Sequence, residues 1–223
     1  MVIQYFLDFL CLFSHPVVGG DILPKTEKAL YQIIYINGPS SSGKSTLIKQ
    51  LQHTLKDPYL HVGIDQLINM MPEKVNDWTG GEASHGFSWK AATDIDGKPM
   101  QLLQIGPFAK KVSETLKQIV QLMAESGYFI IIDDIAFGKE GVDAWREALR
   151  GYQVIYIGIH TPLPVLEERE RARGDRMIGS ARAQFLSVHR GVSYDLEFDT
   201  SKVSVNQIVK SIGQKVYPSV HTQ

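Results

Sequence analysis

The chain has 223 residues, of which 43% are hydrophobic and 21% charged, a composition typical of a globular protein with a full hydrophobic core. Its net charge is −1, which excludes a global positive field that would recruit nucleic acid or an anionic membrane. A single cysteine, Cys11, excludes an intrachain disulfide and fits a reducing compartment, so we expect a cytoplasmic protein.

Residues 1–28 form an N-terminal extension ahead of the first predicted strand. The segment from Val2 to Phe13 is apolar and about as long as the hydrophobic region of a signal peptide, but Asp8 interrupts it and no Lys or Arg precedes Lys25. A membrane-spanning helix needs about 20 apolar residues, so no stable membrane insertion is expected. We expect the segment to pack on the domain or on a second copy, with a weak export or membrane-association signal as the alternative. The oligomeric state is left open.

A glycine-rich loop between a strand and a helix comes next. The run 32–37 is apolar and β-rich, and the leucine and isoleucine residues of 46–55 share one helical face. Between them lies the pattern G-x-x-x-x-G-K-[ST], which occurs by chance in roughly one per cent of chains this long. In this context the loop N–H groups and the helix N-terminus bind phosphate. The predicted nucleotide-binding residues here are Gly38, Pro39, Ser40, Ser41, Ser42, Gly43, Lys44, Ser45 and Thr46.

Beyond this loop, strands and helices alternate to the end of the chain. The stretch 72–107, rich in Gly, Asp and aromatic residues, is expected to be irregular, and so long a loop is usually functional. The alternation predicts an α/β fold, one domain over 29–223, with a five-stranded parallel sheet flanked by helices on both faces. Ligands then bind at the carboxyl ends of the strands. The further strands are predicted over 59–64, 128–132, 154–159 and 194–198, and the further helices over 66–71, 108–126, 139–150, 163–173 and 205–216.

Carboxylates follow two of the predicted strands. Asp133 and Asp134 close the third strand and, because side chains alternate along a strand, point to opposite sides. We expect Asp133 to bind Mg²⁺ together with the hydroxyl of Ser45. The role of Asp134 is left open: it either contacts the substrate or caps the next turn. Asp65 ends the second strand, where it either reaches the reacting phosphate or caps the following helix.

Arginines recur from Arg169 to Arg176. Those on the predicted helix 163–173 are either surface cations paired with glutamates one turn away or part of a catalytic segment. Gly174 breaks the helical period while the cations continue, which surface pairing does not explain. Phosphoryl transfer uses a mobile arginine-bearing segment to neutralise charge on the transferred group, so we expect this role for Arg173 and Arg176.

Together these segments resemble the chloramphenicol phosphotransferase family of P-loop kinases. The resemblance covers about residues 33–217, and the order and spacing of its motifs are far more specific than the glycine-rich loop alone. Residues 73–105 are longer than in the antibiotic-modifying enzyme, and the extension before Ala29 has no counterpart in it. The matching segments are Asn37 to Ser45, Val62 to Ile68 with Met71 and Pro72, Ile130 to Asp134, Arg169 to Arg176, and Val188 to Asp195 with Asp199 and Thr200.

The resemblance implies a P-loop kinase that transfers the γ-phosphate of ATP to a hydroxyl of the antibiotic. The family's catalytic base, an aspartate at the end of the second strand, falls here on Asp65, and its arginine-bearing lid falls on about 169–183, where Arg169 joins the nucleotide site. We therefore expect an ATP- and Mg²⁺-dependent O-phosphotransferase acting on chloramphenicol or a related small molecule. Lys44 is expected to act in catalysis beside Asp65, Arg173 and Arg176.

Two other functions would use the same phosphate site. A nucleoside or nucleotide kinase needs polar groups that recognise a base, and Asn76, Asp77 and Lys90 are available in the stretch 73–106. A nucleotide-dependent switch or ATPase would turn over ATP without an acceptor. Nucleic acid is not an expected partner, because the arginines are concentrated where a lid should be.

The aromatic residues of the same stretch have two interpretations. Trp78, Phe87 and Trp89 either form an apolar wall for the acceptor or build a small core of their own. The sequence leaves the identity of the acceptor open.

Overall fold

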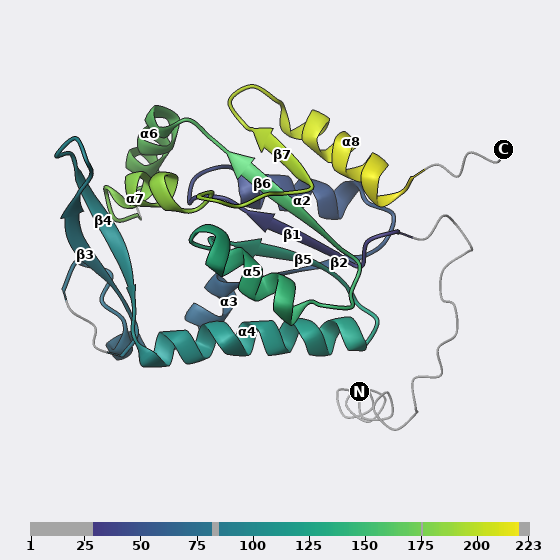
Figure 1. The fold of residues 1–223 in the computed structure, drawn as a ribbon, viewed down its shortest axis with the longest axis horizontal. Helices are drawn as coiled ribbons and strands as arrows, with labels where there is room; N and C mark the ends of the chain where they lie inside the picture. Colours follow the sequence, from purple (N-terminus) through teal and green to yellow (C-terminus); the bar gives the residue numbers. More distant parts are fainter. Residues whose placement is uncertain (1–28, 82–84, 175, 219–223) are drawn as a thin grey trace, which may run out of the picture.

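The centre of the protein is a five-stranded sheet in the order β2-β5-β1-β6-β7, in which all neighbouring strands are parallel (Figure 1). The computed structural model describes residues 29–81, 85–174 and 176–218. The middle strand β1 is buried along its whole length. The predicted α/β fold with five parallel strands is confirmed. The strands are β1 (Ile33–Asn37), β2 (Tyr59–Gly63), β5 (Phe129–Asp134), β6 (Val154–His160) and β7 (Leu196–Asp199).

Helices cover both faces of the sheet, as predicted (Figure 1). Ile34 and Ile36 of β1 pack in one core with α2 and α8, and Ile33 and Tyr35 pack in a second core with α4 and α5. One strand supplies both cores because adjacent side chains point to opposite faces. The helices are α2 (Lys44–Thr54), α3 (Ile64–Ile68), the 3₁₀ helix η1 (Glu73–Val75), α4 (Pro107–Glu125), α5 (Gly138–Ala148), α6 (Leu163–Arg173), α7 (Ser180–Ser187) and α8 (Val205–Val216).

The stretch 72–107 contains a β-hairpin, so the expectation of an irregular loop was wrong there. Strands β3 (Phe87–Thr93) and β4 (Pro99–Ile105) pair antiparallel, apart from the main sheet. Their turn is built on Asp94, whose Oδ1 accepts from the N–H groups of Asp96 (3.0 Å) and Lys98 (2.8 Å). A largely exposed hairpin lacks clear hydrophobic alternation, which is why the pattern missed it. An Asp-Gly pair in the turn was the available signal.

Arg182 fastens this hairpin to the helices beside it. Its Nη1 lies 2.7 Å from Oδ2 of Asp94 in the hairpin turn, and its Nη2 lies 2.6 Å from Oε1 of Glu167 in α6. The Arg182 and Asp94 side chains are only 13% and 5% exposed. The N–H of Gln101 in β4 also donates to the carbonyl of Gly179 (3.2 Å). Arg182 in α7 therefore joins three segments that are far apart in the sequence.

Arg182→Met is expected to loosen the hairpin, because it leaves two carboxylates without their cation. Hydrogen–deuterium exchange of the hairpin amides should become faster, and the thermal midpoint should fall. The matched control is Arg150→Met, since the pair of Arg150 with Glu147 is exposed (78% and 68%) and such pairs contribute little. Equal, small effects of the two substitutions would contradict the fastening role.

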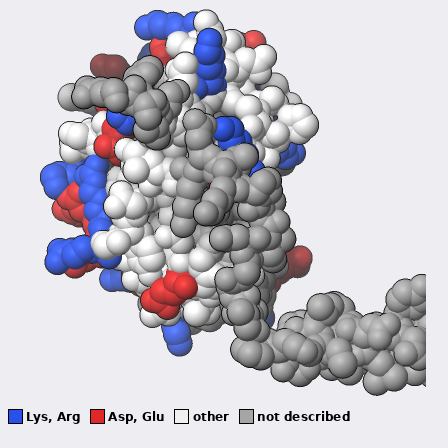
Figure 2. Space-filling view, turned by 90° about the vertical axis from the view of Figure 1, so that its right-hand side faces the viewer, with Lys and Arg blue, Asp and Glu red and all other residues white. Residues whose placement is uncertain are grey.

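The surface carries charges of both signs. On the face in Figure 2, Lys and Arg side chains are interspersed with Asp and Glu. Within the described ranges, no helix has the length and apolarity needed to cross a bilayer. The N-terminal extension 1–28, with its predicted packing or targeting role, lies outside the described residues.

Candidate active site

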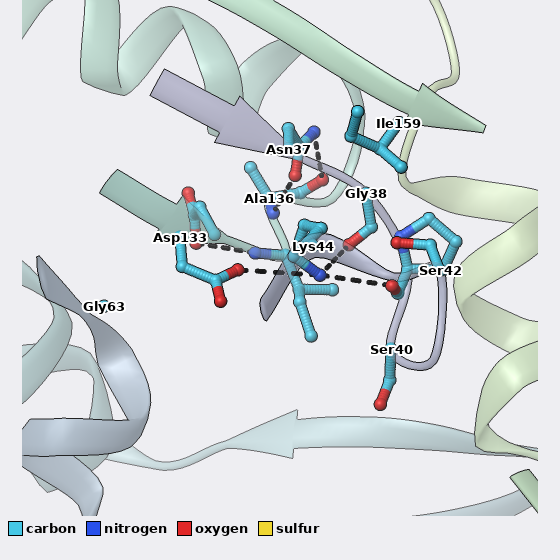
Figure 3. Close-up of polar contacts among 12 residues, drawn as sticks. Asn37, Gly38, Ser40, Ser42, Lys44, Gly63, Asp133, Ala136 and Ile159 are labelled. Atoms are coloured by element: carbon cyan, nitrogen blue, oxygen red, sulfur yellow. Dashed lines mark hydrogen bonds and ion pairs between the residues drawn. The ribbon is translucent and has the colours of Figure 1, made fainter. Parts of the chain in front are cut away.

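The predicted phosphate loop connects the carboxyl end of β1 to α2, at the edge where the parallel strands end (Figure 3). Gly38, the first residue of the loop, packs against β6. A Cβ atom at this position would lie 2.6 Å from the carbonyl oxygen of Ile159, so only glycine fits. The loop therefore starts at a position fixed by backbone contact.

Three side chains from distant segments brace the loop. Oε1 of Gln184 in α7 accepts a hydrogen bond from the N–H of Ser40 (2.6 Å). Arg169 donates to the carbonyl of Ser41 (3.2 Å), and Thr200 donates to the carbonyl of Ser42 (3.0 Å). The loop conformation thus depends on α6, α7 and the segment after β7.

Lys44 is buried at the start of α2, with only 6% of its surface exposed. Its ammonium donates to the carbonyls of Gly38 (2.8 Å) and Pro39 (3.1 Å) and lies 3.7 Å from Oδ1 of Asp133 (Figure 3). Burial lowers the pKa of Lys44, while the nearby carboxylates, first among them Asp133, act in the opposite direction. The side chain brings a cation, balanced by acidic residues, to the inside of the loop.

The two aspartates that close β5 point to opposite sides, as the alternation predicts. Asp133 faces the phosphate loop, and its Oδ2 lies 3.6 Å from Nε2 of His61 on β2. Asp134 accepts hydrogen bonds from the Tyr35 hydroxyl and from the N–H of Ile135, both at 2.8 Å. Burial raises the pKa of Asp134, and these two bonds partly offset the shift. The contact with the next N–H favours the capping interpretation of Asp134.

Asp65 lies in the first turn of α3 and is exposed. The helix begins at Ile64, not at Gln66 as predicted, and its N-cap is Gly63. The N–H of Gly63 donates to Oε1 of Gln66 (2.9 Å), which completes the cap. The alternative role of Asp65 as N-cap is therefore wrong, because another residue occupies that position.

One cavity of about 630 Å³ brings the predicted site residues together. Asp133 lines it from the end of β5, Asp65 lines it from the first turn of α3, and the arginines line it from α6 and the segment after it. Gly38 and Pro39 are not among the lining residues; their carbonyls bind Lys44 instead. The predicted residues that do line the cavity are Ser40, Ser41, Ser42, Gly43, Lys44, Ser45, Thr46, Asp65, Asp133, Arg169, Arg173 and Arg176.

The arginine-bearing segment is tied down by a buried glutamate. Glu170 in α6, 2% exposed, accepts from the N–H groups of Gly179 (2.8 Å) and Ala181 (2.7 Å) and from the hydroxyl of Ser180 (2.7 Å). It thereby caps α7, which the sequence pattern did not predict. The local pattern missed this helix because its cap comes from the preceding helix rather than from the residue before it.

Ser45 and Asp133 offer oxygen ligands of the kind that Mg²⁺ prefers, and both line the cavity. Mg²⁺ retains waters and phosphate oxygens, so a hydroxyl and a carboxylate are sufficient protein ligands. The described part of the chain contains no cluster of three or more His, Cys, Asp or Glu that could hold a metal. The donor set thus fits Mg²⁺ bound together with nucleotide phosphates.

His61 and Gln184 are among the residues at this site that were not predicted from the sequence. His61 lines the cavity beside Asp133, and strand alternation, which places it on the same side as Gly63, could have identified it. Gln184 carried no local signal, because it reaches Ser40 from 144 positions away in the chain.

Comparison with known proteins agrees with this geometry. The family described as chloramphenicol phosphotransferase-like protein matches residues 31–217. The chain belongs to this family. Two Mycobacterium tuberculosis proteins, from strains CDC 1551 and H37Rv and provisionally named O-phosphotransferases, are each 27% identical over 182 residues, which is 81% of this chain and 80% of theirs. This member of the chloramphenicol phosphotransferase-like family is therefore a kinase, an enzyme that transfers a phosphoryl group.

Solved structures share the fold of this family member. A sugar kinase from Janibacter sp. HTCC2649 superposes with a TM-score of 0.56 at 17% identity, covering 86% of this chain and 99% of that chain. A protein of Chloroflexus aurantiacus, provisionally described as a kinase, gives a TM-score of 0.52 at 17% identity, covering 85% and 99%. At these identities the likeness shows a shared fold and leaves the substrate open.

Proposed function

We propose that this kinase transfers the γ-phosphate of ATP, with Mg²⁺, to a hydroxyl group of a small molecule, chloramphenicol or a related compound. The observation that supports this proposal is that one cavity is lined by the phosphate loop, by the carboxylates Asp65 and Asp133 and by three arginines. Phosphoryl transfer depends on positioning and charge stabilisation in one site, and a cavity of about 630 Å³ is within the range of ligand pockets.

The donor half of the reaction uses the phosphate loop. Its backbone N–H groups and the ammonium of Lys44 bind the β- and γ-phosphates, while Thr46 and Arg169 contact the nucleotide. Ser45 and Asp133 would hold Mg²⁺, which neutralises charge on the phosphate oxygens. Asp133, the proposed metal ligand, lies 3.7 Å from the ammonium of Lys44, which supports this arrangement.

The acceptor half uses Asp65 and the arginines. Asp65 accepts a hydrogen bond from the acceptor hydroxyl, orients its oxygen toward the γ-phosphate and takes its proton as the new P–O bond forms and the bond from the γ-phosphorus to the departing ADP breaks. In a loose transition state the hydroxyl loses its proton late, so a carboxylate is a sufficient base. Arg173 and Arg176, acting as a lid, neutralise charge on the transferred group.

The acceptor contacts come from the strand ends rather than from the aromatic residues of 73–106. None of the described residues that line the cavity belongs to that stretch. Phe87 is 3% exposed and packs with Met71 and Ala109, and the Trp78 ring stacks on it with centroids 5.8 Å apart. These contacts favour a small core of their own over an acceptor wall.

The alternative of a nucleoside or nucleotide kinase loses two of its base-recognition candidates. Oδ1 of Asn76 accepts from the N–H of Phe87 (2.8 Å), and Oδ1 of Asp77 accepts from the N–H (2.8 Å) and hydroxyl (2.7 Å) of Thr79. Both groups are engaged in the local fold. The kinase fold is compatible with this alternative, so it is retained as one outcome of the test.

The direct test is a screen of acceptors with MgATP, read as phosphorylated product by mass spectrometry. The panel contains chloramphenicol, related hydroxylated aromatic compounds, sugars, nucleosides and nucleotides. We expect ATP turnover that depends on a non-nucleoside hydroxyl compound. Phosphorylated nucleosides or nucleotides alone would replace the proposal with the alternative, and acceptor-independent ATP hydrolysis would indicate a switch or ATPase.

A further inference from the structure

A chain of hydrogen bonds joins the start of the phosphate loop to the C-terminal segment 188–195, which the mechanism above does not use. Nδ2 of Asn37 donates to the Tyr194 hydroxyl (2.9 Å), and this hydroxyl lies 2.9 Å from Nδ1 of His189. Nε2 of His189 lies 3.1 Å from the carbonyl oxygen of Ile159. The chain therefore begins at the last residue of β1 and ends in β6.

Both ends of this chain meet Gly38. Asn37 directly precedes Gly38, and the Ile159 carbonyl is the atom against which Gly38 packs (Figure 3). The amide of Asn37 is fixed further, since its Oδ1 accepts from the N–H of Ala136 (2.9 Å). The backbone on either side of the loop entrance is thus held by the same set of side chains.

The hydrogen-bond partners determine where the protons lie. A carbonyl only accepts, so Nε2 of His189 carries the proton that it donates to Ile159. Nδ1 is then the acceptor, and the Tyr194 hydroxyl donates to it while accepting from Asn37. A protonated His189 would carry hydrogen on Nδ1 and would lose the bond from Tyr194. With neutral His189, every donor in this chain has an acceptor.

The surroundings keep His189 in this neutral form. Burial, together with the nearby His160 and Lys44, lowers the pKa of His189 to about 4. The centroids of the His160 and His189 rings are 4.0 Å apart. The hydrogen bond to Ile159 acts in the opposite direction. His160 in turn lies 2.7 Å from Glu197, and Asp199 lines a shallow cavity with both histidines.

The Tyr194 hydroxyl is fixed in position and in protonation. A Cβ atom on Gly158 would lie 2.6 Å from Cδ2 of the Tyr194 ring, so the ring packs directly on the backbone of β6. Gly158 is also the residue of β6 that pairs in register with Asn37. Burial raises the pKa of Tyr194 to about 12, so the hydroxyl keeps the proton that it donates.

We propose that His189 and Tyr194 are positioning residues of the phosphate loop. Through Asn37 and the Ile159 carbonyl they fix the backbone around Gly38 and so align the loop N–H groups for the nucleotide. Neither side chain lines the main cavity, so both act through the loop. The inference rests on the proposed role of this loop in ATP binding.

Tyr194→Phe tests the proposal because it removes the hydroxyl and keeps the ring against Gly158. The dissociation constant of MgATP is measured by calorimetry on the full chain at pH 7.5 and 5.5. We expect binding about 3- to 10-fold weaker than in the wild type at pH 7.5, the range for one lost hydrogen bond. At pH 5.5 this ratio should be larger than at pH 7.5, because neutral His189 has lost its donor and its pKa rises toward that pH. Titration of the nucleotide itself is common to both proteins and cancels in the ratio.

A double variant assigns the added pH dependence to His189. In Tyr194→Phe/His189→Gln the amide can still donate to Ile159 but does not titrate, so the growth of the ratio between pH 7.5 and 5.5 should disappear. The matched control is Tyr217→Phe. The Tyr217 hydroxyl accepts from the N–H of Asp57 and donates to its Oδ2, both at 2.9 Å, at a distance from the loop, so this variant should bind MgATP like the wild type.

Several outcomes would overturn the positioning role. They are an unchanged dissociation constant in Tyr194→Phe, a lower thermal midpoint with unchanged binding, and a pH effect that survives in the double variant. If Tyr194→Phe does not fold, His189→Gln alone decides, with binding about 3-fold weaker expected and wild-type binding contradicting the proposal. A wild type that does not bind MgATP would instead contradict the proposed function of the loop.

Discussion

Asp65→Asn is expected to lower acceptor-dependent turnover by about 100-fold or more, with the dissociation constant of ATP changed by less than about twofold. The amide cannot take the proton of the acceptor hydroxyl, so only the transfer step is affected. The helix should persist, because its N-cap is formed by Gly63 and Gln66 and not by Asp65. Steady-state kinetics and calorimetry with MgATP measure the two quantities separately.

The control for this prediction is Glu147→Gln, the same carboxylate-to-amide change at an exposed position of α5, which should leave both quantities unchanged. Turnover of Asp65→Asn within about threefold of the wild type would show that another group takes the proton. His61, which lines the same cavity, would then be the next candidate.

Lys44→Met is expected to damage both nucleotide binding and transfer. Removing a buried cation from the phosphate loop takes away charge-assisted hydrogen bonds to the phosphates, so the affinity for ATP should fall about 10-fold or more. Turnover at saturating ATP should fall about 100-fold, because the same charge stabilises the transferring group. Calorimetry and single-turnover phosphorylation measure the two effects.

Lys49→Met is the matched control, since Lys49 is exposed on the same helix one turn later. It should bind ATP and turn over like the wild type. A normal ATP affinity in Lys44→Met, with a thermal midpoint that shows a folded protein, would argue against the phosphate loop as the nucleotide site.

Patterns that are local in the sequence predicted the fold well. The apolar run 129–132 and the run that precedes Gly38 identified two central strands, because strands buried on both faces show continuous hydrophobicity. The exposed hairpin 87–105 lacks that signature and was missed. Helix α7 was missed because its cap, Glu170, lies outside the local window.

The same distinction between local patterns and distant contacts applies to the candidate site. The loop 38–46 and the positions of Asp65, two residues after β2, and of Asp133, at the end of β5, follow from short segments. The bracing of the loop by Gln184 and its link to Tyr194 do not, since these residues lie 144 and 157 positions from their partners Ser40 and Asn37. No pattern in a single sequence indicates which distant side chains will meet.

The sequence by itself determined that the chain is a P-loop α/β protein. The spacing of glycines and the period of hydrophobic residues depend on the backbone conformation of residues that are close together in the sequence. The strand order β2-β5-β1-β6-β7 was decided only in the tertiary structure, and it is this order that brings Asp133 to Lys44. The proton arrangement from Asn37 through Tyr194 to His189 was likewise decided there. Both depend on contacts between segments distant in sequence, whose hydrogen-bond partners exist only once the chain has folded.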